Sequence, residues 1–264
     1  MLAATDCQFV VLCGKLGRAI KPTTNGNPRL NHNLLLSHTM AKFICCLVLI
    51  TLVASEAPTE QERKALLDFH NSKRATVRPP AANMLEMVYS PSLENLAVDW
   101  VARCKFEHPN VNQHPEYRDT GQNLALSGGS SRNLVQQATG WWNEVYNYTY
   151  ETNTCATGKV CGHYTQMVWA TSGELGCAVK QCDSLKPDWP PPVLLMACQY
   201  KPPGNYMGAK PYISGTSCSQ CPSETKCVNN LCSKGRSRAS TAASTYTWVG
   251  EIALFAVLQV YPFV

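Results

Sequence analysis

No run of five or six like charges occurs in this 264-residue sequence, and Asp, Glu, Lys and Arg together make up only 16% of it. Proteins that bind nucleic acid usually concentrate Lys and Arg in one segment or on one face. The formal net charge of +5 is modest. Nucleic-acid binding therefore has little support, and only a general attraction to anionic surfaces stays open.

Signatures of catalysis are also scarce. The sequence lacks a G-x-S-x-G motif, which would place a nucleophilic serine on a strand-to-helix turn. No third strong metal ligand stands near a pair of histidines. Hydrophobic residues nevertheless account for 45% of the chain, as in globular proteins with a proper core. The sequence predicts a globular protein with no recognisable catalytic centre.

Cysteine, in contrast, is abundant, with 14 residues. Ten of them lie between Cys104 and Cys232, an even number, as expected if all of them pair in an oxidising compartment. Zinc is the alternative for the last four, because Cys218 and Cys221 form a C-x-x-C pair. A zinc ribbon usually has a second such pair about 15 residues away, which is missing here. We therefore favour disulfides.

Both ends of the chain carry targeting patterns. Residues 40–55 have a charged start, an apolar run and small residues at the end, the layout of a signal peptide. Residues 1–39 are then an upstream extension, and we expect the mature, secreted chain to begin at Glu56. Residues 233–264 consist of a polar linker and an apolar tail, which predicts a glycosylphosphatidylinositol signal. A single-pass anchor, or no anchor at all, is the alternative.

Helical patterns dominate the first half of the mature chain. A capping box at Thr59–Glu62 predicts the start of one helix, and Ser90–Pro91 predicts the start of a second one, with apolar residues at helical spacing up to Cys104. A third helix is expected at 131–146 after a glycine-rich loop, and strands are expected at 175–179 and 193–200. Early helices and late strands indicate helices that cover an antiparallel sheet, an α+β domain.

Four motifs follow one another in this part of the chain. They read His-Asn-Ser-Lys-Arg at 70–74, Gly-Gln-Asn-Leu-Ala at 121–125, Gly-His-Tyr-Thr-Gln-Met-Val-Trp at 162–169, and Cys-Gln-Tyr-Lys-Pro-Pro-Gly-Asn-Tyr at 198–206. In this order and spacing they resemble the signatures of the CAP superfamily, which includes cysteine-rich secretory proteins, venom allergens and plant pathogenesis-related proteins. The resemblance implies a three-layer α-β-α sandwich at 56–212 and a cysteine-rich hinge at 213–232.

The same resemblance implies how the ten cysteines pair, since spacing alone cannot decide connectivity. Two disulfides would tie the sandwich together and one would close a local loop, while two more would hold the hinge, which has almost no apolar residues of its own. The implied pairs are Cys104 with Cys182, Cys177 with Cys198, Cys155 with Cys161, Cys218 with Cys227, and Cys221 with Cys232.

CAP proteins are similar in having a cleft lined by two histidines and two acids. The matching positions here are His108, Gln122, Glu144 and His163. Two imidazoles and a carboxylate (His108, His163 and Glu144) are suitable ligands for Zn²⁺, or the imidazoles could move protons near neutral pH. Gln122 departs from the family pattern, because an amide carries no charge and ligates metal poorly. We therefore expect only weak zinc binding.

Each of these residues also has a structural interpretation. His163 and Glu144 would form a buried hydrogen-bonded pair that holds sheet to helix, and His108 would simply be exposed in its loop. His70 is expected to be structural, through a backbone hydrogen bond near Arg74. Asn147-Tyr148-Thr149 is an N-glycosylation acceptor, which predicts a surface loop with a glycan on Asn147.

The resemblance therefore favours a secreted or surface-anchored binding protein without enzymatic activity. Its implied ligands are a sterol or other lipid in an apolar groove, or an extracellular protease that the protein inhibits. An extracellular hydrolase is the first alternative, and it would need a hydroxyl such as that of Thr165 or Ser172 beside His108 or His163. A purely structural surface protein is the second.

Overall fold

The computed structural model describes residues 57–129 and 131–235. The predicted upstream extension, signal peptide and C-terminal anchor, and most of the polar linker, lie outside these residues. Within the described ranges, no helix is long and apolar enough to cross a membrane.

The centre of the fold is a four-stranded sheet in the order β1-β5-β6-β2. Strand β5 (Glu174–Gln181) and strand β6 (Val193–Lys201) pair antiparallel, and β6 pairs antiparallel with β2 (Gly121–Gly128). The short edge strand β1 (Val88–Tyr89) runs parallel to β5. The predicted antiparallel sheet is thus confirmed for its three long strands.

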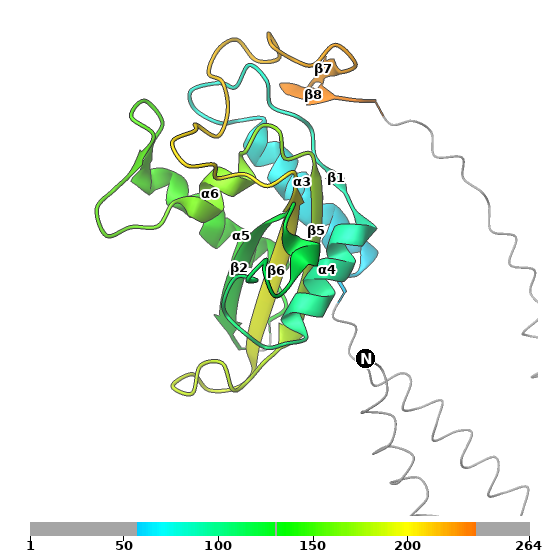
Figure 1. The fold of residues 1–264 in the computed structure, drawn as a ribbon, viewed down its shortest axis with the longest axis vertical. Coiled ribbons are helices and arrows are strands. Elements are labelled where there is room, and N and C mark those ends of the chain that lie inside the picture. Colours follow the sequence, from blue (N-terminus) through cyan, green and yellow to red (C-terminus); the bar gives the residue numbers. More distant parts are fainter. Residues whose placement is uncertain (1–56, 130, 236–264) are drawn as a thin grey trace, which may run out of the picture. The chain divides into compact units, whose positions relative to one another are not determined.

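Helices cover both faces of this sheet (Figure 1). Helix α4 (Pro91–Val101) packs Trp100 against Ala178 and Leu195 on one face. Helices α3 (Glu60–Arg74) and α5 (Leu134–Trp142) cover the other face, where Leu66 and Met196 are both buried. Because side chains alternate along a strand, β6 supplies both cores and is buried along almost its whole length. The α-β-α sandwich is confirmed.

The N-terminal capping box forms as predicted. The Glu62 amide donates to Thr59 Oγ1 at 3.2 Å, and the Thr59 amide donates to Glu62 Oε2 at 2.7 Å. Arg132 also binds the Glu62 carboxylate, and the pKa of this carboxyl is lowered although burial acts in the opposite direction. Helix α3 therefore begins where local sequence places it.

Two local predictions were wrong. Residues 127 and 128, expected in the glycine-rich loop before the third helix, belong to strand β2 (Gly121–Gly128), because all eight residues of the strand pair in register with β6. The third helix is shorter than predicted, since it begins after the Asn133 cap and gives way to a 3-10 turn, η2 (Asn143–Asn147). The motif at 162–169 begins with a short helix, α6 (Gly162–Met167).

The hinge is a two-stranded sheet of β7 (Lys226–Val228) and β8 (Leu231–Ser233). Its backbone joins the sandwich, because the Cys232 amide donates to Met84 O at 2.8 Å and the Glu86 amide donates to Cys232 O at 3.0 Å. Leu231 is buried with the sandwich core. The hinge therefore takes part of its stability from the domain before it.

All five disulfides form as the family resemblance implies. Cys104–Cys182 joins the segment after α4 to the end of β5, and Cys177–Cys198 joins β5 to β6. Cys155–Cys161 closes a loop that begins in the small hairpin of β3 (Tyr148–Thr149) and β4 (Thr154–Cys155). Such cross-links stabilise a domain largely by restricting its unfolded chain.

Candidate functional site

Glu144 and His163 form the best-connected pair among the four predicted cleft residues. Glu144 lies in η2 and His163 in the first turn of α6. Glu144 Oε1 is 2.5 Å from His163 Nδ1, while Oε2 accepts hydrogen bonds from the amides of His163 (3.0 Å) and Tyr164 (3.1 Å). The carboxylate therefore satisfies free amides at a helix start. The predicted pair exists, although it joins two helical segments and not a helix to the sheet.

The His163 ring is also held from its face. It stacks on Trp141 with the ring centroids 6.2 Å apart and the planes at 14°. Trp141 is buried and donates its indole N–H to Leu124 O at 3.0 Å. The next residue, Trp142, is half-buried and packs against the edge of the same core. The imidazole is thus fixed by a carboxylate at its edge and an aromatic ring on its face.

His108 and Gln122 form the second pair. His108 is exposed in the loop after α4, and its Nδ1 lies 2.9 Å from Gln122 Oε1 on β2. Gln122 Nε2 is buried and finds no hydrogen-bond partner within the described part of the chain. A buried donor without a partner destabilises a fold by about 1–3 kcal/mol. A glutamate at this position would accept from the same imidazole and leave no such donor.

Whether zinc fits this site depends on which nitrogen each histidine leaves for a metal ion and on how close the ligands lie. Each histidine uses Nδ1 toward a side-chain oxygen, which leaves Nε2 for a metal ion. Metal-binding histidines commonly hold their second nitrogen in this way. Among residues 57–129 and 131–235, however, His108, Glu144 and His163 do not bring their ligating atoms within 4.8 Å of one another. The imidazoles are chemically suitable zinc ligands that Glu144 and Gln122 orient, but the three predicted ligands do not form one close group.

Within the described residues, a different group of potential metal-ligating atoms does lie within this distance. The sulfurs of Cys218, Cys221 and Cys232 are within 4.8 Å of one another. All three belong to hinge disulfides, and a disulfide sulfur is not a thiolate ligand. The group therefore offers no metal site while the hinge is oxidised.

A buried hydrogen-bond network of Asn123, Tyr200 and His70, which the sequence did not reveal, contacts the backbone of α6. Asn123 Nδ2 donates to His163 O at 3.0 Å and to Tyr200 Oη at 3.2 Å. Tyr200 Oη lies 3.0 Å from His70 Nε2, and His70 Nδ1 lies 2.8 Å from Leu66 O. Because Leu66 O can only accept, His70 carries its proton on Nδ1 and accepts from Tyr200.

Charge is almost excluded from this network. Burial lowers the pKa of His70 to about 4, and the Arg74 charge acts in the same direction. Burial also raises the pKa of Tyr200 well above its ordinary value. His70 is therefore neutral at physiological pH. Its predicted structural role fits these contacts, with Leu66 as the backbone partner.

Arg74 is buried, and no acidic side chain in the described part of the chain is bonded to its guanidinium. Its guanidinium donates to the carbonyls of Leu85, Met167, Trp169 and Ala170, and burial lowers its pKa to about 9. These bonds tie α3 to the segment after α6. Arg74 therefore positions the chain on which His163 is mounted and does not face a ligand.

Neither hydroxyl considered as a nucleophile is hydrogen-bonded to a cleft imidazole. Thr165 Oγ1 donates to Cys161 O at 3.1 Å and lies 2.7 Å from Asn205 Oδ1. Ser172 Oγ donates to Pro202 O at 2.8 Å and accepts from Gln166 Nε2 at 3.1 Å. Both hydroxyls have structural partners of their own. Asn147, the predicted glycosylation site, lies half-buried in η2 beside the exposed Thr149.

The sandwich and its five disulfides define a cross-linked α+β domain with two oriented imidazoles. Residues 67–200 match the family model of the Cysteine-rich secretory protein family, CAP. The chain is 36% identical over 203 residues to human GLIPR1-like protein 1, covering 72% of this chain and 82% of that protein. It is 34% identical over 201 residues to bovine Peptidase inhibitor 16, covering 74% of this chain and 42% of the relative. The chain belongs to the CAP family.

Solved structures agree with this assignment. Na-ASP-1 is 29% identical and superposes with a TM-score of 0.56, covering 68% of this chain and 48% of that one. The structure described as NaASP2 with Zn²⁺ is 28% identical, with a TM-score of 0.53 and coverage of 68% and 98%. This chain thus spans less than half of Peptidase inhibitor 16 and of Na-ASP-1.

Proposed function

We propose that this chain is a secreted, non-enzymatic CAP protein that binds an extracellular protein partner, first of all a protease that it inhibits. One observation carries the proposal. Both cleft imidazoles are engaged by an amide or a carboxylate, while the two nearby hydroxyls are bonded elsewhere. A nucleophile needs a base within hydrogen-bond reach, and the described residues offer no such couple at this site.

Relatives support the partner class. Two relatives, Peptidase inhibitor 16 and human Peptidase inhibitor 15, are named as inhibitors. Peptidase inhibitor 15 is 38% identical over 192 residues, covering 67% of this chain and 72% of that protein. Five disulfides fit an oxidising, extracellular location. They would also keep a binding surface rigid, which lowers the entropy lost on association.

The test uses the full chain, secreted with its disulfides intact. It is titrated against serine, cysteine, aspartic and metalloproteases, and residual activity is measured on small peptide substrates. We expect dose-dependent inhibition of at least one class and no hydrolysis of the peptides by this chain alone. Peptide hydrolysis that disappears in His163→Gln but survives in His114→Gln, a half-buried histidine outside the site, would restore the hydrolase alternative.

Weak zinc binding is a second candidate, favoured because each oriented imidazole uses Nδ1 toward a side-chain oxygen and, among residues 57–129 and 131–235, makes no hydrogen bond through Nε2. When bound, the metal would be held by His108 and His163 and would supply a positive charge to the cleft. Calorimetry with Zn²⁺ should give a small heat that His163→Gln removes and Gln122→Glu increases. His114→Gln is the matched control. No heat, together with no change on Gln122→Glu, would remove the metal from the proposal.

Sterol or lipid binding and attachment to the membrane stay predictions from the sequence. Saturable uptake of a labelled sterol by the secreted chain would support the first of these. Release of the protein from cells by a phosphatidylinositol-specific phospholipase would support a lipid anchor. If neither inhibition nor uptake is observed, the structural surface role becomes the better explanation.

A further inference from the structure

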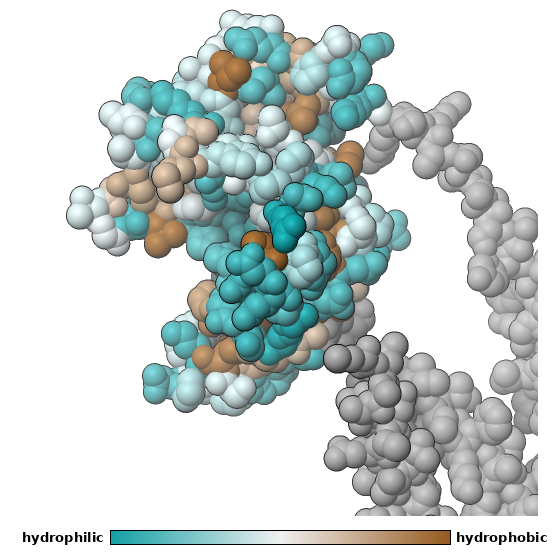
Figure 2. All heavy atoms as spheres, viewed as in Figure 1, coloured by the Kyte–Doolittle hydropathy of each residue, from teal (hydrophilic) through white to brown (hydrophobic). Residues whose placement is uncertain are grey.

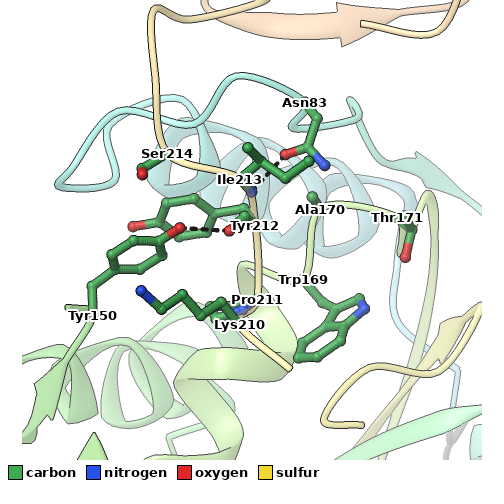
Figure 3. A pocket seen from close by; sticks show the side chains of 10 residues that line it. All are labelled: Asn83, Tyr150, Trp169, Ala170, Thr171, Lys210, Pro211, Tyr212, Ile213 and Ser214. Atoms are coloured by element: carbon green, nitrogen blue, oxygen red, sulfur yellow. Dashed lines mark hydrogen bonds between the residues drawn. The ribbon is translucent and has the colours of Figure 1, made fainter. Parts of the chain in front are cut away.

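A hollow of about 510 Å³ lies apart from the four cleft residues, between the segment that follows α6 and the segment that leads into the hinge (Figure 3). Trp169 lines it from the first of these segments, Lys210 and Ile213 line it from the second, and Asn83 and Tyr150 lie at its sides. His108, Gln122, Glu144 and His163 do not line it. It is thus a separate candidate site.

Its walls are held in place without a ligand. Tyr150 stacks on Tyr212 with the centroids 4.7 Å apart, and its hydroxyl donates to Tyr212 O at 2.6 Å. The Ile213 amide donates to Asn83 Oδ1 at 2.9 Å, and the Ala170 amide donates to Pro211 O at 2.7 Å. A preformed hollow loses little conformational entropy when it is filled.

The charge of the hollow has one sign. Among its described lining residues Lys210 is the only charged one, and none of them is Asp or Glu. Lys210 Nζ lies 4.7 Å from the centroid of the Tyr150 ring and donates one hydrogen bond to Glu151 O at 2.9 Å. An ammonium group has three donors, so two remain for a carboxylate. Ile213, 48% exposed, offers apolar contact at the same rim.

A second hollow of about 350 Å³ shares Trp169 with the first. Its lining contains Lys159 and, within the described part of the chain, again no acidic residue. Tyr206 and Met207 stand at this hollow with 57% and 102% of their surface exposed. Most hydrophobic residues on the face drawn in Figure 2 form small separate patches. Exposed Tyr and Met beside hollows are typical of interaction surfaces.

The loop that carries Tyr206 and Met207 is braced on both sides. Asn205 Nδ2 donates to Gly162 O at 2.8 Å, and Asn153 Nδ2 donates to Ala209 O at 3.1 Å. Tyr206 also contacts Trp169, with the ring centroids 5.8 Å apart. The two exposed side chains therefore sit on a supported turn at the second hollow, where Tyr206 contacts the shared Trp169.

We propose that these two hollows form one docking surface for an extended acidic segment of a partner protein. A carboxylate of that segment binds Lys210, and the neighbouring apolar side chain packs beside Trp169 and Ile213. Charge complementarity selects an anionic occupant, and the adjoining Tyr206–Met207 turn provides contact area for a polypeptide. The inference rests on the proposed function in that it names where the protein partner binds.

The experiment measures fluorescence anisotropy with the full secreted chain. The probe is a labelled synthetic peptide of alternating leucine and glutamate, and matched peptides carry glutamine or lysine in place of glutamate. We expect the glutamate peptide to bind most tightly. Lys210→Gln should weaken it by about 2- to 5-fold, the range for one exposed ion pair, and Ile213→Ser should weaken it as well.

Lys186→Gln is the matched control, because Lys186 Nζ also lies near an aromatic ring, 5.9 Å from the centroid of Trp189, in another loop. It should leave the affinity unchanged. If Lys210→Gln fails to fold, Ile213→Ser keeps the ammonium contacts and carries the test. Equal binding of the glutamate and lysine peptides, or no effect of either variant, overturns the proposal. Octanoate binding as tightly as the peptide also overturns it in favour of a small carboxylate.

The experiments distinguish failure of this docking surface from failure of the proposed inhibitor role. Peptide binding that depends on Lys210, with no protease inhibited, leaves the surface standing and removes the inhibitor role. Protease inhibition that is unchanged in Lys210→Gln and Ile213→Ser, with no peptide binding, leaves the inhibitor role and removes this surface.

Discussion

Acidification should destabilise this protein through His70 in a pH window set by two pKa values. The folded-state pKa of His70 is about 4, against an ordinary value of 6.5. As the pH falls, the unfolded chain takes up this proton first. The stability that neutral His70 contributes is therefore complete above pH 6.5 and is lost as the pH falls toward about 4.

The size of the effect follows from the width of this window. At 1.36 kcal/mol per pKa unit the whole window is worth about 3 kcal/mol, and about 2 kcal/mol of it is lost between pH 7 and pH 5. For a domain of this size that loss lowers the melting temperature by about 4–8 °C. The physical cause is burial, which disfavours the charged imidazolium, and the Arg74 charge acts in the same direction.

The assay compares urea unfolding of the wild type and His70→Gln at pH 7.0, 6.0, 5.0 and 4.5. Glutamine can accept from Tyr200 but does not titrate, so the variant should lose less stability on acidification. Subtracting the two curves cancels the carboxylates common to both proteins. His114→Gln, which replaces a half-buried histidine, should follow the wild type. Parallel curves for wild type and His70→Gln would refute the assignment.

Three further predictions follow from the site and the cross-links. Glu144→Gln should lower the free energy of unfolding by about 1–3 kcal/mol, because it removes a charged acceptor from the start of α6. Glu116→Gln, at an exposed position, is the control. Equal stability of the two variants would contradict the prediction. Mass mapping of unreduced peptides should recover the five disulfides of the structure, and a free thiol among those ten cysteines would count against extracellular folding. Asn147→Gln should abolish the mass shift caused by peptide-N-glycosidase, and a shift that persists would place the glycan elsewhere.

Local signals predicted the features that depend on neighbouring residues. The Thr59 capping box begins α3 as expected, because its two hydrogen bonds span only three residues. Asn133, which caps α5, is also a local signal, yet the third helix was predicted to begin earlier. The ordered motifs, taken together, were sufficient to predict the sandwich, the hinge and the cysteine pairs.

Strand β2 could not be predicted from local sequence. Its sequence, GQNLALSG, has two glycines and no β-branched or aromatic residue, so it has little strand propensity. It becomes a strand because β6 pairs with it along its full length. The same holds for Trp141, whose burial depends on the strand and imidazole that it meets.

The order of the motifs and the cysteines along the chain was sufficient to predict the family and the cross-linked α+β architecture, and it named four candidate cleft residues. Tertiary structure alone decided that these residues form two separate oriented pairs, that neutral His70 and Asn123 support one of them, and that Lys210 meets Trp169 in a hollow. The physical reason is that side chains far apart in sequence acquire their pKa, partners and exposure from the packing of helices on the sheet, which no local pattern specifies.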